Sequence, residues 1–420
     1  MENSKFSGYK VAFGCFLVMF IHLGMLSSVG VFIPRIAEGL NVPVGRVSLM
    51  VTFAMIVAFL MSFVTPRMLQ KFNPRVLMYI ASFFAVGHYL MFAFAPNVYV
   101  VWLAAALGGI TLGFGTNAVC AAVLGAWFIR NRASIVGIVF GGAAVGAAVF
   151  QFIGGITIAA VGWRTAYIII GVAGAAIALL ANILFVRDDP EKLGQKALGW
   201  DDIQETATAA DNAQTVVQGV TATEAMKTAS FWLLFVGVVV GGFLITGFQS
   251  FAPAFWQENG MEAVRSASYL SLYSLLGCLG VMLAGVIADK FGNKGFLTII
   301  LLAYVLGLFC ATRYATNQSV ILVLLTCILV AISYPASTSI PATVTTGAFG
   351  NKDYAKIVAY LMAALYLGKC LVSPVMSAIA AKTGGLMGGF IALIIFGIIT
   401  WVLCMLGLIT APVNKMKSTK

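Results

Sequence analysis

One lysine of this 420-residue sequence stands in the middle of a long apolar run. Lys369 lies about halfway along residues 356–381, and the six acids outside the segment 187–229 all fall in loops, tails or the ends of apolar runs. A buried ammonium group is costly unless it is paired. Two interpretations stay open: Lys369 binds an anion that the protein does not itself supply, or it is a structural residue that hydrogen-bonds carbonyls or loses its charge.

Two hydroxyl groups accompany Lys369 if residues 356–381 form a helix. Tyr366 and Ser373 stand three residues before it and four residues after it, so that all three would lie on one helix face. A cation flanked by two hydroxyl groups suits a carboxylate. The spacing therefore predicts that Lys369, Tyr366 and Ser373 form part of an anion-binding site.

Other polar residues also interrupt the apolar runs. His22, near the middle of the first run, is a candidate proton carrier or, equally, a hydrogen-bonded packing residue. Five more are either helix–helix hydrogen-bonding residues or contacts for a bound molecule: Asn117, Gln151, Gln249, Tyr273 and Tyr334. Tyr334 and Pro335 with Pro341 also predict a broken or bent helix, whose freed carbonyls would face a cavity.

The sequence lacks the motifs of enzyme and metal sites. It contains no phosphate-binding GxxxxGK[ST] loop, no HExxH pair and no GxSxG nucleophile turn. Its two histidines, His22 and His88, are far apart in the sequence, and its seven cysteines form no CxxC pair. We therefore expect no enzyme activity, no cofactor and no metal site, and we expect no direct use of ATP.

The elements that must position these residues are long apolar helices. Of all residues 61% are apolar and only 9% are charged, and the mean hydropathy is +1.00. Twelve runs are long enough to cross about 30 Å of hydrocarbon as helices. They are 11–33, 46–66, 77–95, 99–126, 135–160, 165–186, 230–256, 266–288, 296–313, 319–346, 356–381 and 386–410. The composition excludes a typical soluble enzyme and predicts an all-α polytopic protein in a lipid bilayer.

Membrane topology explains the net charge of +11 without any binding of nucleic acid. With the N-terminus in the cytoplasm, 18 Lys and Arg residues would lie inside and six outside, which is the bias expected of a membrane protein. The longest polar segment, 187–229, carries eight acids and four bases. We expect it to be a cytoplasmic linker between two six-helix bundles, 1–186 and 230–420, with both termini in the cytoplasm.

The two halves repeat each other at an offset of about 220 residues. Residues 125–136, which begin Gly-Ala-Trp, align without gaps with 347–358, which begin Gly-Ala-Phe, at an offset of 222. Two shorter matches at an offset of 219 agree with this alignment: 32–34 with 251–253, and 70–73 with 289–292. Parallel repeats are one architecture of membrane transporters, and they place a binding site between the halves near the midplane.

A loop in the second half carries a family motif. The sequence GVIADKFGNK, residues 285–294, resembles the G-x-x-x-D-[RK]-x-G-x-[RK] signature of the major facilitator superfamily. The resemblance implies two six-helix bundles that open a central cavity alternately to each side. It also implies a conformational latch formed by Gly285, Asp289, Lys290 and Gly292. The first-half copy departs from the signature, with Pro66, Gln70 and Asn73 at three of its positions.

A narrower resemblance concerns carriers of small organic acids. The sequences GVFIP (30–34) and WFIRNRA (127–133), the second followed by a Gly-rich run, resemble the oxalate/formate antiporter and monocarboxylate porter branch. Lys369 matches the antiporters' lysine in the eleventh span, whereas the mammalian porters' charged eighth-span residues have no counterpart here. This resemblance implies transport of a mono- or dicarboxylate.

We therefore predict a secondary transporter of a small organic anion, driven by substrate exchange or by proton symport with His22 as the titratable group. The alternatives are a carrier of a neutral solute or drug and, from another class, a non-transporting membrane sensor. Drug/proton antiporters commonly use membrane carboxylates that this chain lacks, and the segment 187–229 is short for a sensor's output domain. We expect a monomer in a plasma membrane, the inner membrane of a bacterium.

Overall fold

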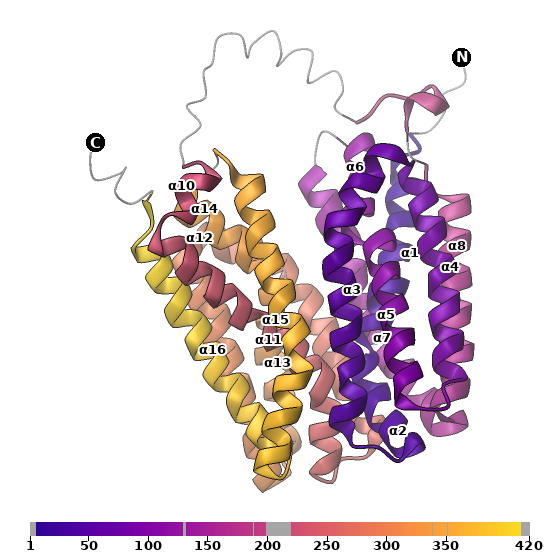
Figure 1. The fold of residues 1–420 in the computed structure, drawn as a ribbon, viewed down its shortest axis with the longest axis vertical. Coiled ribbons are helices and arrows are strands. Elements are labelled where there is room, and N and C mark those ends of the chain that lie inside the picture. The colour runs from indigo at the N-terminus through magenta and orange to yellow at the C-terminus, as the bar shows by residue number, and fades with distance from the viewer. Residues whose placement is uncertain are drawn as a thin grey trace. The chain divides into compact units, whose positions relative to one another are not determined.

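The computed structural model (Figure 1) describes residues 6–128, 132–187, 189–198, 220–337, 339–350 and 352–412. Residues 129–131 of the WFIRNRA motif and 199–219 of the predicted linker lie outside these ranges. The regular elements within them are helices, and Phe128 and Leu198 form an isolated β-bridge. Nine of the described helices are long and apolar enough to cross a membrane. The all-α class predicted from the composition is confirmed.

The first six predicted runs form helices with two unforeseen breaks. The elements are α1 (Gly8–Ser27), α2 (Val29–Leu40), α3 (Val44–Lys71), α4 (Pro74–Ala93), α5 (Val98–Gly115), α6 (Asn117–Trp127), α7 (Arg132–Ala166), the π-helical turn η1 (Tyr167–Val172) and α8 (Ala173–Leu184). The first run is divided at Ser28 and the fourth at Thr116. Both side chains donate hydrogen bonds to carbonyls of the preceding turn, those of Met25 and Leu112, and such bonds bend helices.

The second half contains the tenth-span break that the prolines predicted. Its elements are η2 (Glu191–Leu193), α10 (Ala222–Met226), α11 (Ala229–Glu258), α12 (Ala263–Asn317), α13 (Val320–Ile332), the 3-10 turn η3 (Tyr334–Ser337), α14 (Ile340–Phe349), α15 (Tyr354–Thr383) and α16 (Leu386–Ile409). The long helix α12 contains the predicted eighth and ninth spans, which meet at a kink at Gly292. Pro335 lies inside η3, and Pro341 lies in the first turn of α14.

By its internal contacts the chain divides into two compact units. The first comprises Met1–Val29 and Val57–Val216, and the second comprises Gly30–Ile56 and Val217–Lys420. In the first unit α1 packs on α7 and α4 packs on α5, whereas in the second α11 packs on α15 and α16. The end of the first span and the start of the second span therefore group with the second unit. The division into 1–186, 187–229 and 230–420 stays a prediction.

The same close contact between two helices occurs in both halves of the sequence repeat. A Cβ atom on Gly146 of α7 would collide with the Phe20 carbonyl of α1, and a Cβ atom on Gly368 of α15 would collide with the Val239 carbonyl of α11. The glycines are 222 residues apart and the carbonyls 219, which are the offsets of the repeat. Glycine lets helix backbones approach this closely. The second contact fixes α15 on α11 directly beside Lys369.

Candidate functional site

Lys369 forms a hydrogen bond with the turn that breaks the tenth span. Its Nζ atom donates a hydrogen bond to the Ser337 carbonyl at 3.1 Å and lies 5.4 Å from the centre of the Tyr366 ring. Ser337 is the last residue of η3, where the interruption between α13 and α14 frees carbonyls from helical pairing. The sequence predicted such carbonyls, and the structure places one of them on the ammonium group.

Within the described part of the chain, the ammonium group of Lys369 keeps capacity for another acceptor. It has three N–H donors, and the hydrogen bond to Ser337 uses one of them. Two ion pairs of the described residues join Arg35 to Glu38 at 2.6 Å and Lys356 to Asp353 at 3.8 Å, and neither involves Lys369. The carbonyl contact agrees with the structural interpretation of Lys369, and the remaining donors leave room for a carboxylate.

The two predicted hydroxyl neighbours of Lys369 differ. Tyr366 contacts the ammonium through its ring face, a cation–π arrangement. Ser373 is fully buried, and its Oγ atom has no hydrogen-bond partner within the described part of the chain. The helix spacing placed both residues correctly on α15, but only Tyr366 makes a described contact with the lysine.

Three further candidates gather around η3 in the second unit. The rings of Tyr273 on α12 and Tyr334 on η3 are 5.8 Å apart, and Gln249 of α11 lies next to the Tyr334 phenol. The Tyr273 hydroxyl and the Gln249 Nε2 atom are buried without a hydrogen-bond partner among the described residues. Because buried polar atoms are normally paired, these two atoms keep unused hydrogen-bonding capacity.

The first unit holds the remaining three candidates. Gln151 donates to the Ser27 carbonyl at 3.1 Å, which is the helix–helix bond of the simpler interpretation. His22 is 3% exposed, packs against Gly115, and has an unpartnered Nδ1 atom in the described structure. Asn117 is the first residue of α6, directly after the break at Thr116.

The latch motif is described in part. Gly292 has φ 68° and ψ 175°, a conformation that side-chain-bearing residues rarely adopt, which explains a glycine there. Lys290 is exposed and lies over the Phe291 ring. The surroundings of Gly285 and of the Asp289 side chain lie outside the described structure. The motif residue Asn293, which the sequence analysis did not single out, donates to the Thr343 carbonyl of α14 at 3.1 Å.

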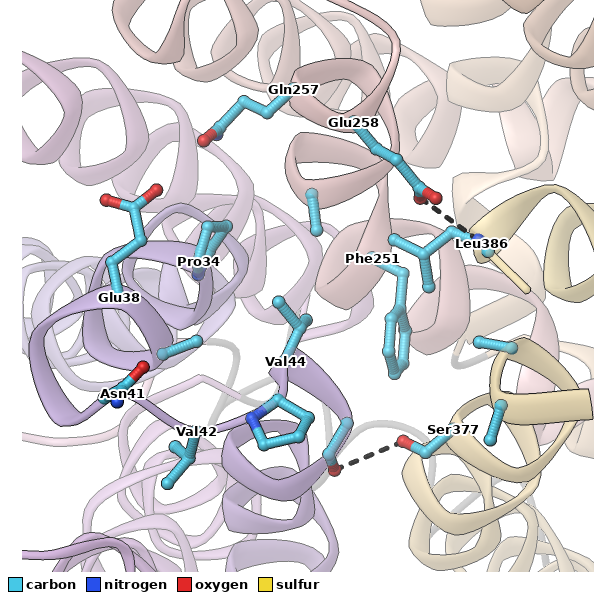
Figure 2. Close-up of a pocket in the computed structure, with 17 residues that line it drawn as sticks. Pro34, Glu38, Asn41, Val42, Val44, Phe251, Gln257, Glu258, Ser377 and Leu386 are labelled. Carbon is cyan, nitrogen blue, oxygen red and sulfur yellow. Dashed lines mark hydrogen bonds between the residues drawn. The ribbon is translucent and has the colours of Figure 1, made fainter.

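A cavity of about 830 Å³ lies in the second unit, between α2, α11 and α15 (Figure 2). Glu38 of α2 and Glu258 of α11 line it, and the Glu258 carboxylate is turned toward Leu386. Both are engaged already, Glu38 with Arg35 at 2.6 Å and Glu258 with the backbone N–H of Leu386 at 3.1 Å. The described lining contains none of the residues that the sequence predicted for substrate binding, so this cavity is separate from the surroundings of Lys369.

Comparison with known proteins identifies the family. The sequence profile described as the Major Facilitator Superfamily matches residues 15–373 and, in a second match, 260–420. The chain belongs to the major facilitator superfamily. It is therefore an integral, multi-pass membrane protein, and its family and fold indicate a secondary transporter of a small molecule rather than an enzyme.

Solved structures of transporters share this superfamily fold. A bacterial homologue of the human lysosomal transporter Spinster matches in its inward-facing unoccupied form, with a TM-score of 0.72, 16% identity and 98% of each chain covered. Its occupied form gives 0.72 at 18% identity, over 96% of this chain and 97% of that one. A variant of the nucleoside transporter NupG gives 0.71 at 12% identity, over 95% and 99%. No curated protein matches significantly. Likeness at these identities extends to the fold alone.

Proposed function

We propose that this superfamily member transports a small organic anion, a mono- or dicarboxylate, by alternating access, as an antiporter or a proton symporter. The observation that supports this is the ammonium of Lys369, whose described partners are one carbonyl and one aromatic ring. A lysine at mid-membrane depth costs roughly 2.5–3.5 kcal/mol. A carboxylate on Lys369 would add a charge-assisted hydrogen bond, which is roughly twice as strong as a neutral one.

The surrounding polar atoms complete the proposed site. Lys369 binds the carboxylate, and the unpartnered atoms of Gln249, Tyr273 and Ser373 offer hydrogen bonds to the rest of the solute. One fixed positive charge favours a monoanion. A dianion would need further hydroxyl donors or the protonated form of His22. The remaining proposed contacts are Tyr366, Tyr334, Asn117 and Gln151.

Uptake of labelled carboxylates into proteoliposomes tests the proposal. We expect Lys369→Gln to lower uptake at least tenfold, because the amide keeps a donor for the Ser337 carbonyl but removes the charge. Lys382→Gln is the matched control, because Lys382 is an exposed lysine in the last turn of the same helix. We expect this control to transport at the rate of the unchanged protein.

The outcomes separate the rival functions. Equal uptake by Lys369→Gln and the unchanged protein would remove Lys369 from the site. Uptake of neutral solutes but of no carboxylate would favour a carrier of neutral solutes or drugs, and no uptake of either class would favour a sensor. A lower melting temperature of Lys369→Gln with unchanged KM and turnover per folded molecule would assign the lysine a structural role.

The driving force is tested in the same vesicles. Preloading them with unlabelled carboxylate accelerates uptake if the protein is an exchanger. An imposed proton gradient accelerates uptake if it is a symporter, and in that case His22→Gln removes the acceleration while uptake without a gradient persists. If the gradient still accelerates the His22→Gln variant, another group carries the proton.

A further inference from the structure

The two ends of the linker bind equivalent positions of the two halves. The N–H of Leu198 donates to the carbonyl of Trp127 at 2.9 Å, and the N–H of Val220 donates to the carbonyl of Phe349 at 3.0 Å. Trp127 and Phe349 are aligned by the repeat at an offset of 222. Each bond lies within one unit, and the same bond is therefore made twice, once at each end of the linker.

Both acceptor carbonyls belong to the last residue of a short helix. Trp127 ends α6, which has 11 residues, and Phe349 ends α14, which has 10. The last carbonyls of a helix have no partner within the helix, and helices shorter than about 12–15 residues are marginal on their own. Both helices begin at a break in a predicted span, so neither gains stability by continuing into a longer helix on that side. The linker N–H groups satisfy carbonyls at the ends where these helices need support.

The first anchor, formed by the described residues of 187–198, is held by more than one hydrogen bond. The indole Nε1 of Trp127 donates to the Arg187 carbonyl at 2.8 Å, and the N–H of Ser7 donates to the Gln195 side chain at 2.9 Å. Trp127 and Phe128 are fully buried in a core that includes residues of α1 and α6. This linker end is therefore packed into the first unit.

The second anchor, residues 220–226, is fastened in a comparable way. The N–H of Ala222 donates to the Asp353 carboxylate at 3.0 Å, and Ala225 is fully buried. A capping box between Thr221 and Glu224 begins α10, and its hydrogen bonds lower the pKa of the exposed Glu224 carboxyl. The anchor thus holds both ends of the turn from α14 to α15. Helix α14 follows η3, which contains Ser337, and helix α15 carries Lys369. The Lys369–Ser337 bond therefore joins α15 to the turn that precedes α14.

We propose that the linker ends are positioning elements of the two halves: the 187–198 anchor holds the half-helix α6, and the 220–226 anchor holds the half-helix α14 and, through it, η3. The anchors act locally. Each anchor makes its hydrogen bonds within its own unit. The proposal concerns the linker and does not depend on the chemistry of the transported solute.

Hydrogen–deuterium exchange of the full chain in detergent tests the two anchors separately. Val220→Pro and Leu198→Pro each remove one donating N–H, and Val220→Ala and Leu198→Ala keep it. We expect Val220→Pro to accelerate exchange at least fivefold in α14 and in η3 but not in α6. Leu198→Pro should accelerate exchange in α6 alone. Both alanine variants should exchange like the unchanged protein.

A gentler variant separates loss of the bond from damage to the fold. Ala222 is the first residue of α10, a position where proline fits a helix, so Ala222→Pro removes only the bond to Asp353. We expect it to accelerate exchange in α14 and at the start of α15, whereas Asp353→Asn, which keeps an acceptor oxygen, should not. Unchanged exchange in Val220→Pro and Ala222→Pro would overturn the proposal.

Cutting the linker tests whether the anchors act alone. A protease site introduced between residues 208 and 212 allows the purified, folded protein to be cut between its anchors. We expect exchange in α6 and α14 to stay unchanged after the cut. Acceleration in both helices, equal to that of the proline variants, would show that the linker works only as a continuous strap and would overturn the local role of its ends.

Discussion

Glu258 illustrates how one side chain joins two helices. It is the last residue of α11, and its carboxylate accepts the N–H of Leu386, the first residue of α16. The first N–H groups of a helix lack partners, and the helix dipole favours a negative charge there. We expect Glu258→Ala to lower the free energy of unfolding by about 0.5–2 kcal/mol, the range measured for lost helix caps. Thermal unfolding of the purified protein checks this value.

Glu262→Ala is the control for that prediction. Glu262 precedes the first residue of α12 but makes no capping hydrogen bond through its side chain. Its removal loses only the interaction of its charge with the helix dipole, so it should lower the melting temperature less than Glu258→Ala does. Equal losses in the two variants would mean that negative charge near this end of the molecule, and not the bond to Leu386, provides the stability.

At the residue scale the sequence located Lys369 better than it located its partners. A single lysine in an apolar run is visible in the sequence, and Pro335 and Pro341 predict the helix break that lies beside it. The bond to Ser337 depends on how α15 packs beside η3, which no local pattern encodes. Helix spacing also placed Ser373 on the face of Lys369 but could not show that its hydroxyl has no hydrogen-bond partner among the described residues.

Gly292 allows a prediction about the kink of α12. Its φ of 68° with ψ of 175° falls in a region that is essentially restricted to glycine, although a Cβ atom there would meet nothing within 4 Å. We expect Gly292→Ala to cost about 1–3 kcal/mol of stability through backbone strain alone. Gly137→Ala is the matched control, because Gly137 lies in the regular part of α7 with equally open surroundings. A similar loss of melting temperature in both variants would argue against strain.

The paired glycines of the repeat support a second prediction at the scale of helices. Alanine at Gly146 or Gly368 would press on the carbonyls of Phe20 or Val239 and push apart α1 and α7 or α11 and α15. We expect each variant to lose about 1–3 kcal/mol, the usual cost of overpacking. The two losses should be similar because the contact is the same, and thermal unfolding against Gly137→Ala measures both. A loss confined to one variant would mean that the contacts only look alike.

Each of the twelve apolar runs is helical over most of its described length. The length of these runs could be used for prediction because a helix needs about 20 apolar residues to cross a bilayer. The breaks at Ser28 and Thr116 were not predicted, because hydropathy continues through both positions. At both positions the side-chain hydroxyl donates to a backbone carbonyl of the preceding turn and so competes with the backbone N–H groups of the helix. The tenth-span break was predicted because proline cannot donate to the helix ladder.

The orientation of the whole molecule is tested by labelling from outside the cell. The bias of Lys and Arg predicts that Lys382 lies outside and Lys294 inside, and both side chains are exposed. We expect a membrane-impermeant maleimide to label Lys382→Cys in intact cells and to label Lys294→Cys only after permeabilisation. The unchanged protein measures the background from its own cysteines, whose described side chains are buried or half-buried. The reverse pattern would invert the proposed topology.

If Lys369 is the charged anion-binding residue of the proposed site, its ammonium has an electrical consequence for the transport cycle. With a monoanion bound, the site carries no net charge, and its reorientation would be indifferent to the voltage across the bilayer. The empty site keeps one positive charge, and moving one charge through 100 mV changes the free energy by about 2.3 kcal/mol. A resting potential would therefore change the rate of only one step, the return of the empty site. An exchanger does not use this step, because its site always returns with a substrate bound.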